Sequence, residues 1–323
     1  MSFIALLNPI NMVAEKKKFL LDPSYNPQLS YDENIDKDEL YKYGFPNDEY
    51  VTLAEKIVKI SYKDKTDDEL QAEKGMELSK EEVETKLKLF LKMHGLEKRY
   101  GIIWSRSFLA RTAINATTIK LRLPVSFREE DLLGMLYHEI GTHAIRRINY
   151  EQQPWYKKKK KYGFSSHLQT EEGLAVLHSL LPLKNKLAHS SALRYLAVAK
   201  AQEMGFVKLY QFLNKYIKDP DRCFNATLRL KRGISDTAKG GGYTKDLVYF
   251  EGLVDVWRYL RHHDFEIDHL YFGRLAMEDT EKAREMNSEF KPLLPSFYVT
   301  NKEKYKQEML KIGQANMLDK LQS

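Results

Sequence analysis

The chain has 323 residues, 43% of them hydrophobic and 12% aromatic, which is enough apolar material for one large domain or two ordinary ones and excludes wholesale disorder. Lys and Arg outnumber Asp and Glu by 52 to 45, so the net charge of +7 favours acidic partners without choosing among nucleic acid, anionic membrane and acidic polypeptide. The single cysteine, Cys223, excludes a disulfide scaffold and favours a reducing, intracellular location. No apolar run approaches the ~18 residues of a membrane span, and no basic leader precedes the short apolar run near the start. We therefore expect a soluble, cytoplasmic protein.

The beginning of the chain differs in composition from the rest. Residues 1–35 carry three prolines among Asn, Ser and Tyr, which predicts an extended arm that lies on a larger body. Residues 61–82 are rich in charge and poor in apolar side chains, as in exposed helix and loop. The sequence thus predicts an N-terminal arm with a helical or loop segment over 1–78, packed on a single main domain over 79–323.

The main domain begins with a clear helix. Ser79 and Glu82 have the spacing of a capping box, and Gly95 is a plausible C-terminal stop. Between them runs an apolar stripe at helical spacing, formed by Val83, Leu87, Phe90 and Leu91. The next apolar segment, 100–104, reads as a strand.

The segment 116–127 alternates between apolar and polar residues and predicts a half-buried strand. Its apolar face is formed by Ile119, Leu121, Leu123 and Val125. Because Pro124 cannot donate a hydrogen bond to a neighbouring strand, we expect an edge strand. An outer strand of this kind can bind an extended peptide by strand addition.

A second helix follows directly and should extend from about residue 127 towards 149. Ser126 and Glu129 suggest another capping box, and three acidic residues then favour the first helical turn. Further helices are expected at 172–181, 192–217, 248–261 and 302–321, with a glycine loop at 240–242. A few strands followed by many helices predict an α+β fold, mainly α, with a small antiparallel or mixed sheet before the second helix.

The strongest chemical signal lies in the middle of that helix, where residues 138–143 read His-Glu-Ile-Gly-Thr-His. The familiar zinc-peptidase pattern places two histidines four residues apart, so that both face one metal ion. Here His138 and His143 are five apart, and on a regular α-helix their directions would differ by about 140°. A wide turn or π-bulge would bring them together. We therefore predict a helix distortion at 140–142.

A hydrolytic zinc ion usually takes three protein ligands. The best candidate for the third is Glu172, which is expected to open a second helix and precedes a glycine, Gly173, that would allow close packing against the helix of the two histidines. Two simpler interpretations stay open. Glu171 and Glu172 could be charges that favour a helix start, and His138 could be an ordinary core histidine.

Four segments together resemble a known family. They are HEIGTH at 138–143, INYEQQPW at 148–155, TEEGLAVLHSLL at 170–181 and GGYTKD at 241–246, the last followed by Tyr249 and Gly252. The pattern, which spans roughly residues 80–320, is similar to that of the microtubule-associated tyrosine carboxypeptidases, zinc peptidases that remove the C-terminal tyrosine of α-tubulin.

The resemblance implies a zincin-like helical metallopeptidase, with residues 79–323 as the catalytic domain. It implies that one Zn²⁺ per chain is held by His138, His143 and Glu172, and that Glu139 is the catalytic base. It also implies a cytoplasmic, microtubule-associated protein whose partner is an acidic polypeptide tail, α-tubulin or the microtubule, with neither nucleic acid nor membrane as partner.

In such a mechanism Glu139 would take a proton from water and deliver it to the leaving amine. A tyrosine hydroxyl could stabilise the oxyanion, and a basic side chain could bind the terminal carboxylate of the substrate. The candidate substrate-binding residues are Tyr243 and Tyr249 for the first role, and Lys245, Arg232 or Arg229 for the second.

Two further features attract attention. Lys157 to Lys161 are five consecutive lysines, which suggest a solvated loop or, alternatively, a footing for an acidic tail. His262, His263 and His269 could form a second metal site, although surface histidines are the simpler interpretation.

Two other functions stay open for the chain as a whole. One is a zinc endopeptidase or amidase with another substrate. The other is a catalytically silent basic binding module, against which the intact Glu139 argues.

Overall fold

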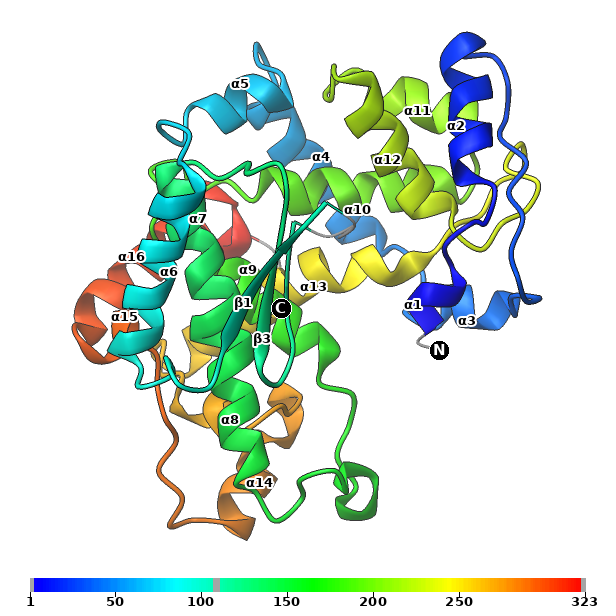
Figure 1. Ribbon diagram of the computed structural model, residues 1–323. Helices are drawn as coiled ribbons and strands as arrows, with labels where there is room; N and C mark the ends of the chain where they lie inside the picture. The colour runs from blue at the N-terminus through cyan, green and yellow to red at the C-terminus, as the bar shows by residue number, and fades with distance from the viewer. Residues whose placement is uncertain (1–2, 107–110, 321–323) are drawn as a thin grey trace. The chain divides into compact units, whose positions relative to one another are not determined.

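A computed structural model describes residues 3–106 and 111–320 and shows an α+β fold that is mainly helical, with one three-stranded sheet, as the sequence predicts (Figure 1). The chain forms two compact units. Unit 1 comprises Met1–Gln71 and Ala188–Phe250, and unit 2 comprises Ala72–Leu187 and Glu251–Ser323. Residues 188–250 thus belong to the same compact unit as the N-terminal residues. The division into an N-terminal segment, 1–78, and a catalytic domain, 79–323, stays a prediction.

Unit 1 is built from helices. They are α1 (Phe3–Leu6), α2 (Met12–Leu21), α3 (Lys37–Tyr41), α4 (Asp48–Ser61), most of α5 (Asp67–Ala72), α10 (His189–Ala201), α11 (Phe206–Leu213), α12 (Pro220–Lys231), the 3₁₀ turn η3 (Thr244–Asp246) and the start of α13 (Leu247–His262). Helix α4 packs along α10, and α11 packs on α12.

Two predictions for unit 1 are wrong. The N-terminal segment is partly helical rather than an extended arm, and its helix α2 is held by Phe19, whose ring packs against both Phe206 and Phe224. The single helix predicted over 192–217 is divided into α10 and α11. The break comes at Gly205, where an added Cβ would lie 2.3 Å from the carbonyl oxygen of Ala238.

Unit 2 carries the sheet and the motif helix. Its elements are α6 (Lys80–Met93), β1 (Gly101–Ser105), β2 (Thr112–Ile114), β3 (Thr118–Arg122), α7 (Glu129–Leu136), the π-helix η1 (Tyr137–Ala144), α8 (Ile145–Glu151), η2 (Lys159–Tyr162), α9 (Leu168–Leu180), η4 (Asp268–Tyr271), η5 (Met277–Asp279), α14 (Thr280–Met286), α15 (Ser296–Val299), α16 (Lys302–Ala315) and η6 (Leu318–Lys320), and most of α13 belongs to it.

The sheet has the strand order β1-β3-β2 and is mixed. Strand β3 pairs in parallel with β1, with Gly101 opposite Thr118, and antiparallel with β2, with Thr112 opposite Leu121. The predicted edge strand is thus the central one. Pro124 lies beyond the end of β3, so its missing N–H interrupts no ladder. Strand addition by a substrate would have to use an outer strand, β1 or β2.

The two predicted capping boxes have different outcomes. Ser79 and Glu82 form theirs at the start of α6, as expected. Ser126 does not cap α7, whose N-cap is Arg128. The N–H groups of Glu129 and Glu130 instead donate to the backbone carbonyls of Met76 and Lys74. Backbone carbonyls of an earlier turn, residues 74–76, thus replace the local cap.

Helix α9 packs closely on two neighbours. Gly134 of α7 lies against α9, where an added Cβ would be 2.6 Å from the carbonyl oxygen of Ser179. Gly173 lies against α13, where a Cβ would be 2.0 Å from Gly252. The expectation that Gly173 packs on the motif helix is therefore wrong, since Gly134 makes that approach. Within residues 3–106 and 111–320, none of the helices has the length and apolar character needed to cross a bilayer.

Candidate active site

The motif helix changes its winding where the sequence predicts it. Residues Tyr137–Ala144 form a π-helix between α7 and α8, and the predicted distortion at 140–142 lies inside it. Because hydrogen bonds in a π-helix join residues five apart, a spacing of five brings two side chains to the same side. The rings of His138 and His143 accordingly lie side by side in an edge-to-face arrangement, with centroids 4.9 Å apart.

Side chains from other segments hold the π-helix. The buried Tyr271 donates its hydroxyl hydrogen to the carbonyl of Gly141 at 2.6 Å. Thr142 donates to the carbonyl of Tyr137 at 3.0 Å, and its hydroxyl oxygen lies 2.8 Å from Nδ1 of His178. Since the Thr142 hydrogen is already used, the ring N–H of His178 must be the donor in that second bond. The wide turn is therefore fixed from two sides.

Three potential metal ligands converge at this turn. One ligand atom from each of His138, His143 and Glu172 lies within 4.8 Å of the other two, and the described residues contain no other such group of His, Cys, Asp or Glu. Nε2 of His143 is 3.6 Å from Oε2 of Glu172. Two ligands of a tetrahedral zinc ion, each about 2.0–2.1 Å away from it, would be about 3.3 Å apart. The chemistry of the donor set fits zinc, and the separation of His143 and Glu172 is close to the value expected for two zinc ligands.

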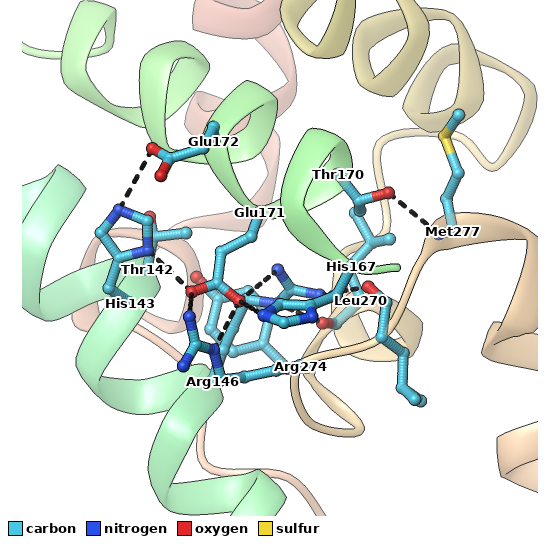
Figure 2. A network of polar contacts seen from close by, with 12 residues as sticks. Thr142, His143, Arg146, His167, Thr170, Glu171, Glu172, Leu270, Arg274 and Met277 are labelled. Carbon is cyan, nitrogen blue, oxygen red and sulfur yellow. Dashed lines mark hydrogen bonds and ion pairs between the residues drawn. The ribbon is translucent and has the colours of Figure 1, made fainter. Parts of the chain in front are cut away.

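Glu171, adjacent to Glu172, points to the other side of α9 and contacts the back of His143. Its Oε1 accepts a hydrogen bond from Nδ1 of His143 at 2.9 Å, which leaves Nε2 for the side of Glu172 (Figure 2). Arg274 donates to Glu171 from two nitrogens, at 2.7 and 2.9 Å, and Arg146 lies at 3.4 Å. A buried carboxylate thus fixes which ring nitrogen of His143 faces the ligand cluster.

The electrostatics of the metal-free chain follow from this arrangement. Burial alone would lower the pKa of His143, but the hydrogen bond to Glu171 and the charge of Glu172 raise it to about 9. Burial, together with the neighbouring His143, lowers the pKa of His138 to about 3. Although burial opposes ionisation of Glu171, its bond to His143 and the charges of Arg274 and Arg146 hold its pKa well below the ordinary value.

Glu139, the predicted base, is next to the first histidine and is only 9% exposed. Its Oε1 accepts a hydrogen bond from Oγ1 of Thr112 at 2.8 Å. Thr112 belongs to β2, the outer strand that packs against the π-helix. The carboxylate is therefore held at one oxygen, which leaves the other available for a proton.

The predicted substrate-binding residues lie in unit 1, whereas the ligand cluster lies in unit 2, so their role stays a prediction. Tyr243 is buried in a small apolar cluster with Leu7 and Leu40. Lys245 lies in the turn η3, and Arg232, which is partly buried, follows α12.

Two other candidates in unit 1 are linked to each other. Arg229 makes a two-nitrogen ion pair with the buried Asp246, which occupies its guanidinium group. Tyr249 is half-buried and hydrogen-bonds to Arg229. A substrate carboxylate that bound Arg229 would therefore have to share its guanidinium group with Asp246.

Sequence reasoning missed Glu171, Thr112 and Tyr271 as contacts of the site. A signal existed only for Glu171, because a second glutamate beside a proposed ligand is a natural partner for a metal-bound histidine. The histidines at 262, 263 and 269 form no metal-binding group within the described residues.

Similarity to known proteins identifies the family of the chain. The family model described as microtubule-associated tyrosine carboxypeptidase matches residues 34–312. The chain belongs to this family. It is 31% identical to microtubule-associated tyrosine carboxypeptidase 1 of Rattus norvegicus and 30% identical to the proteins of the same name in Mus musculus and Homo sapiens. Each match covers 98% of this chain and 68–69% of the relative.

Family membership, together with the names of these relatives, supports a carboxypeptidase function for the chain. All the residues of the candidate site lie within the part of the chain that the family model matches.

Proposed function

We propose that the chain is a zinc metallocarboxypeptidase that removes the C-terminal residue, tyrosine, from an acidic protein tail such as that of α-tubulin. The observation that carries the proposal is the convergence of His138, His143 and Glu172 at the π-helix, with Glu139 beside them, in a chain of a carboxypeptidase family. The tyrosine and the microtubule are taken from the names of the relatives.

The side chains support zinc rather than a harder cation. Two imidazoles and one carboxylate form a set that is typical of catalytic zinc, in which a fourth position stays available. The ring of His143 is also held from behind, by Glu171. When bound, the ion would act as a Lewis acid on the substrate carbonyl and make a water molecule at the site more acidic.

The residues of the chain would then carry the protons. Glu139 would accept a proton from the attacking water and deliver it to the leaving amine as the peptide bond breaks. Thr112 holds one oxygen of Glu139, so the carboxylate has a fixed orientation before the substrate arrives. Pre-set orientation of this kind lowers the entropic part of the barrier.

Strand β2 is a suitable place for the substrate backbone. It is an outer strand of the sheet and contacts the π-helix, and Thr112 links it directly to Glu139. An extended peptide that added to this strand would lie alongside the proposed base, with main-chain hydrogen bonds for affinity.

Mass spectrometry of tubulin after incubation with the zinc-loaded protein tests the proposal. We expect the loss of one terminal tyrosine from α-tubulin and no loss with Glu139→Gln. The matched control is Glu130→Gln on α7, because Glu130 contacts Lys184 rather than the site and should keep full activity.

Other outcomes would support the alternatives. Internal cuts that depend on Glu139 would indicate an endopeptidase. Binding to microtubules without cleavage by zinc-replete protein would indicate a silent binding module. Release of tyrosine at an equal rate by wild type and Glu139→Gln would contradict the assignment of the base.

A further inference from the structure

The lysine run at 157–161 is not a freely solvated loop. It lies in the connection between α8 and α9, the helices that flank and complete the candidate site. Trp155 and Phe164 anchor the two sides of this connection in an apolar cluster with Phe272 and Leu275. The run itself contains the 3₁₀ turn η2. Its backbone therefore has a fixed position on unit 2.

The middle lysine turns inward, unlike its neighbours. Nζ of Lys159 donates to the carbonyl of Arg274 and to Nδ1 of His167, both at 2.7 Å. Nε2 of His167 in turn lies 3.7 Å from Oε2 of Glu171, the residue that contacts His143 (Figure 2 shows the contacts around Glu171). Three successive contacts thus join the run to a candidate metal ligand.

The other four lysines point to solvent. We call Lys157, Lys158, Lys160 and Lys161 the lysine face; all four are exposed. Among residues 3–106 and 111–320, no carboxylate forms an ion pair with any of them. Lys282 adds a fifth cation next to the face, because it donates to the backbone carbonyls of Tyr162 and Gly163. The result is a concentrated positive charge on a fixed backbone.

Distance then decides which partner fits. The contacts through Lys159, His167 and Glu171 place Nζ of Lys159 within about 14 Å of Nδ1 of His143, the length of about four or five extended residues, and the four lysines of the face are chain neighbours of Lys159. A polypeptide whose last residue is at the site would therefore need on the order of five to eight extended residues to reach the face. Four unpaired cations select for acidic side chains at those positions.

We propose that the lysine face is a docking surface for an acidic segment of the substrate polypeptide, a few residues upstream of the residue that is removed. This inference rests on the proposed carboxypeptidase function and adds the charge requirement of its substrate. Because the face acts on substrate binding, we expect its removal to change KM and the dependence of KM on salt, and to leave kcat unchanged.

Two synthetic peptides of equal length test the proposal. Both end in tyrosine, and one has glutamates upstream where the other has glutamines. The variant changes all four residues of the lysine face to Gln and leaves Lys159 in place. We compare kcat/KM for the acidic peptide with kcat/KM for the neutral peptide. At low ionic strength we expect the ratio of these two values to be about tenfold lower in the variant than in wild type, because KM for the acidic peptide rises. We also expect this ratio to depend less on salt concentration in the variant.

The matched control removes the same charge elsewhere. Lys56, Lys59, Lys63 and Lys208 are exposed residues of unit 1, and their joint change to Gln should leave the ratio as in wild type. An unchanged ratio in the lysine-face variant, or an equal fall in the control variant, would overturn the proposal. The thermal unfolding midpoint of each variant checks that the fold is kept.

A binding measurement separates this inference from the proposed function. Fluorescence anisotropy of the labelled acidic peptide with Glu139→Gln protein should show weaker binding when the lysine face is removed, even if no peptide is ever cleaved. A DNA oligonucleotide of equal charge and phosphatidylserine vesicles are the competing probes. If either binds more tightly than the peptide and loses that binding with the face, the face serves nucleic acid or membrane and the proposal is wrong.

Discussion

Replacing Glu171 with Gln tests the part of the site that the structure adds to the sequence. The side chain is 1% exposed and bears the only negative charge in contact with Nδ1 of His143 within the described residues. The substitution keeps the shape but removes the charge that Arg274 and Arg146 share. Loss of such a partner behind a metal-bound histidine typically weakens metal binding by about 10- to 100-fold, or about 1.4–2.8 kcal/mol.

The same change should also lower the free energy of unfolding. Arg146 is fully buried, and one of its three hydrogen-bond partners is Glu171. Leaving a buried cation without its counter-charge costs about 3–5 kcal/mol, and the amide oxygen of Gln recovers part of this. We therefore expect a destabilisation of about 3 kcal/mol in the metal-free protein.

The assay is a competitive zinc titration against a chromophoric chelator, together with urea unfolding of the metal-free protein. Asp246→Asn is the matched control, because Asp246 is a buried carboxylate paired with Arg229 in unit 1. It should be destabilised to a similar extent and bind zinc as wild type does. If Glu171→Gln binds zinc with wild-type affinity, the orienting role assigned to Glu171 is wrong.

Three further substitutions probe other contacts. Thr112→Val removes the hydrogen bond to Glu139. Because a hydrogen bond to a charged group is worth about 1.5–3 kcal/mol, we expect steady-state kinetics to show kcat reduced at least about tenfold with KM little changed. An increase in KM with kcat unchanged would contradict this prediction. Tyr271→Phe removes the hydrogen bond to the carbonyl of Gly141. Urea unfolding should show the free energy of unfolding lowered by about 1–2 kcal/mol, and the zinc titration should show a weaker affinity. Wild-type values for both would show that Tyr271 does not stabilise the π-helix. Burial and the charge of Arg274 lower the pKa of Lys159 to about 8. The unfolded chain keeps that proton up to about pH 10.5, so the free energy of unfolding of wild type, relative to Lys159→Met, should rise between pH 8 and 10.5; a difference that is constant or falls over this range would contradict the burial of the charged group.

The local features of the site could be predicted from the sequence because they depend on spacing. The five-residue interval between His138 and His143 requires a wide turn if both are to face one ion, and the structure has a π-helix there. The capping box at Ser79 and the mixed, mainly helical fold also follow from local patterns.

The rest depends on residues that are distant in sequence. Ser126 does not cap α7 because the first N–H groups of the helix donate to the backbone carbonyls of Met76 and Lys74 instead. The edge-strand prediction fails because β2, only three residues long, pairs with the free side of β3. No local pattern reveals that Arg274, 103 residues from Glu171, neutralises the carboxylate behind His143.

Metal analysis of the purified protein, combined with tyrosine release, tests the central claim most directly. We expect one zinc per chain in wild type and in Glu139→Gln, little or none in His143→Ala, and release of C-terminal tyrosine by wild type alone. Wild-type protein that stays fully active after zinc has been removed by a chelator, or His143→Ala protein that retains a full equivalent of zinc, would contradict the account.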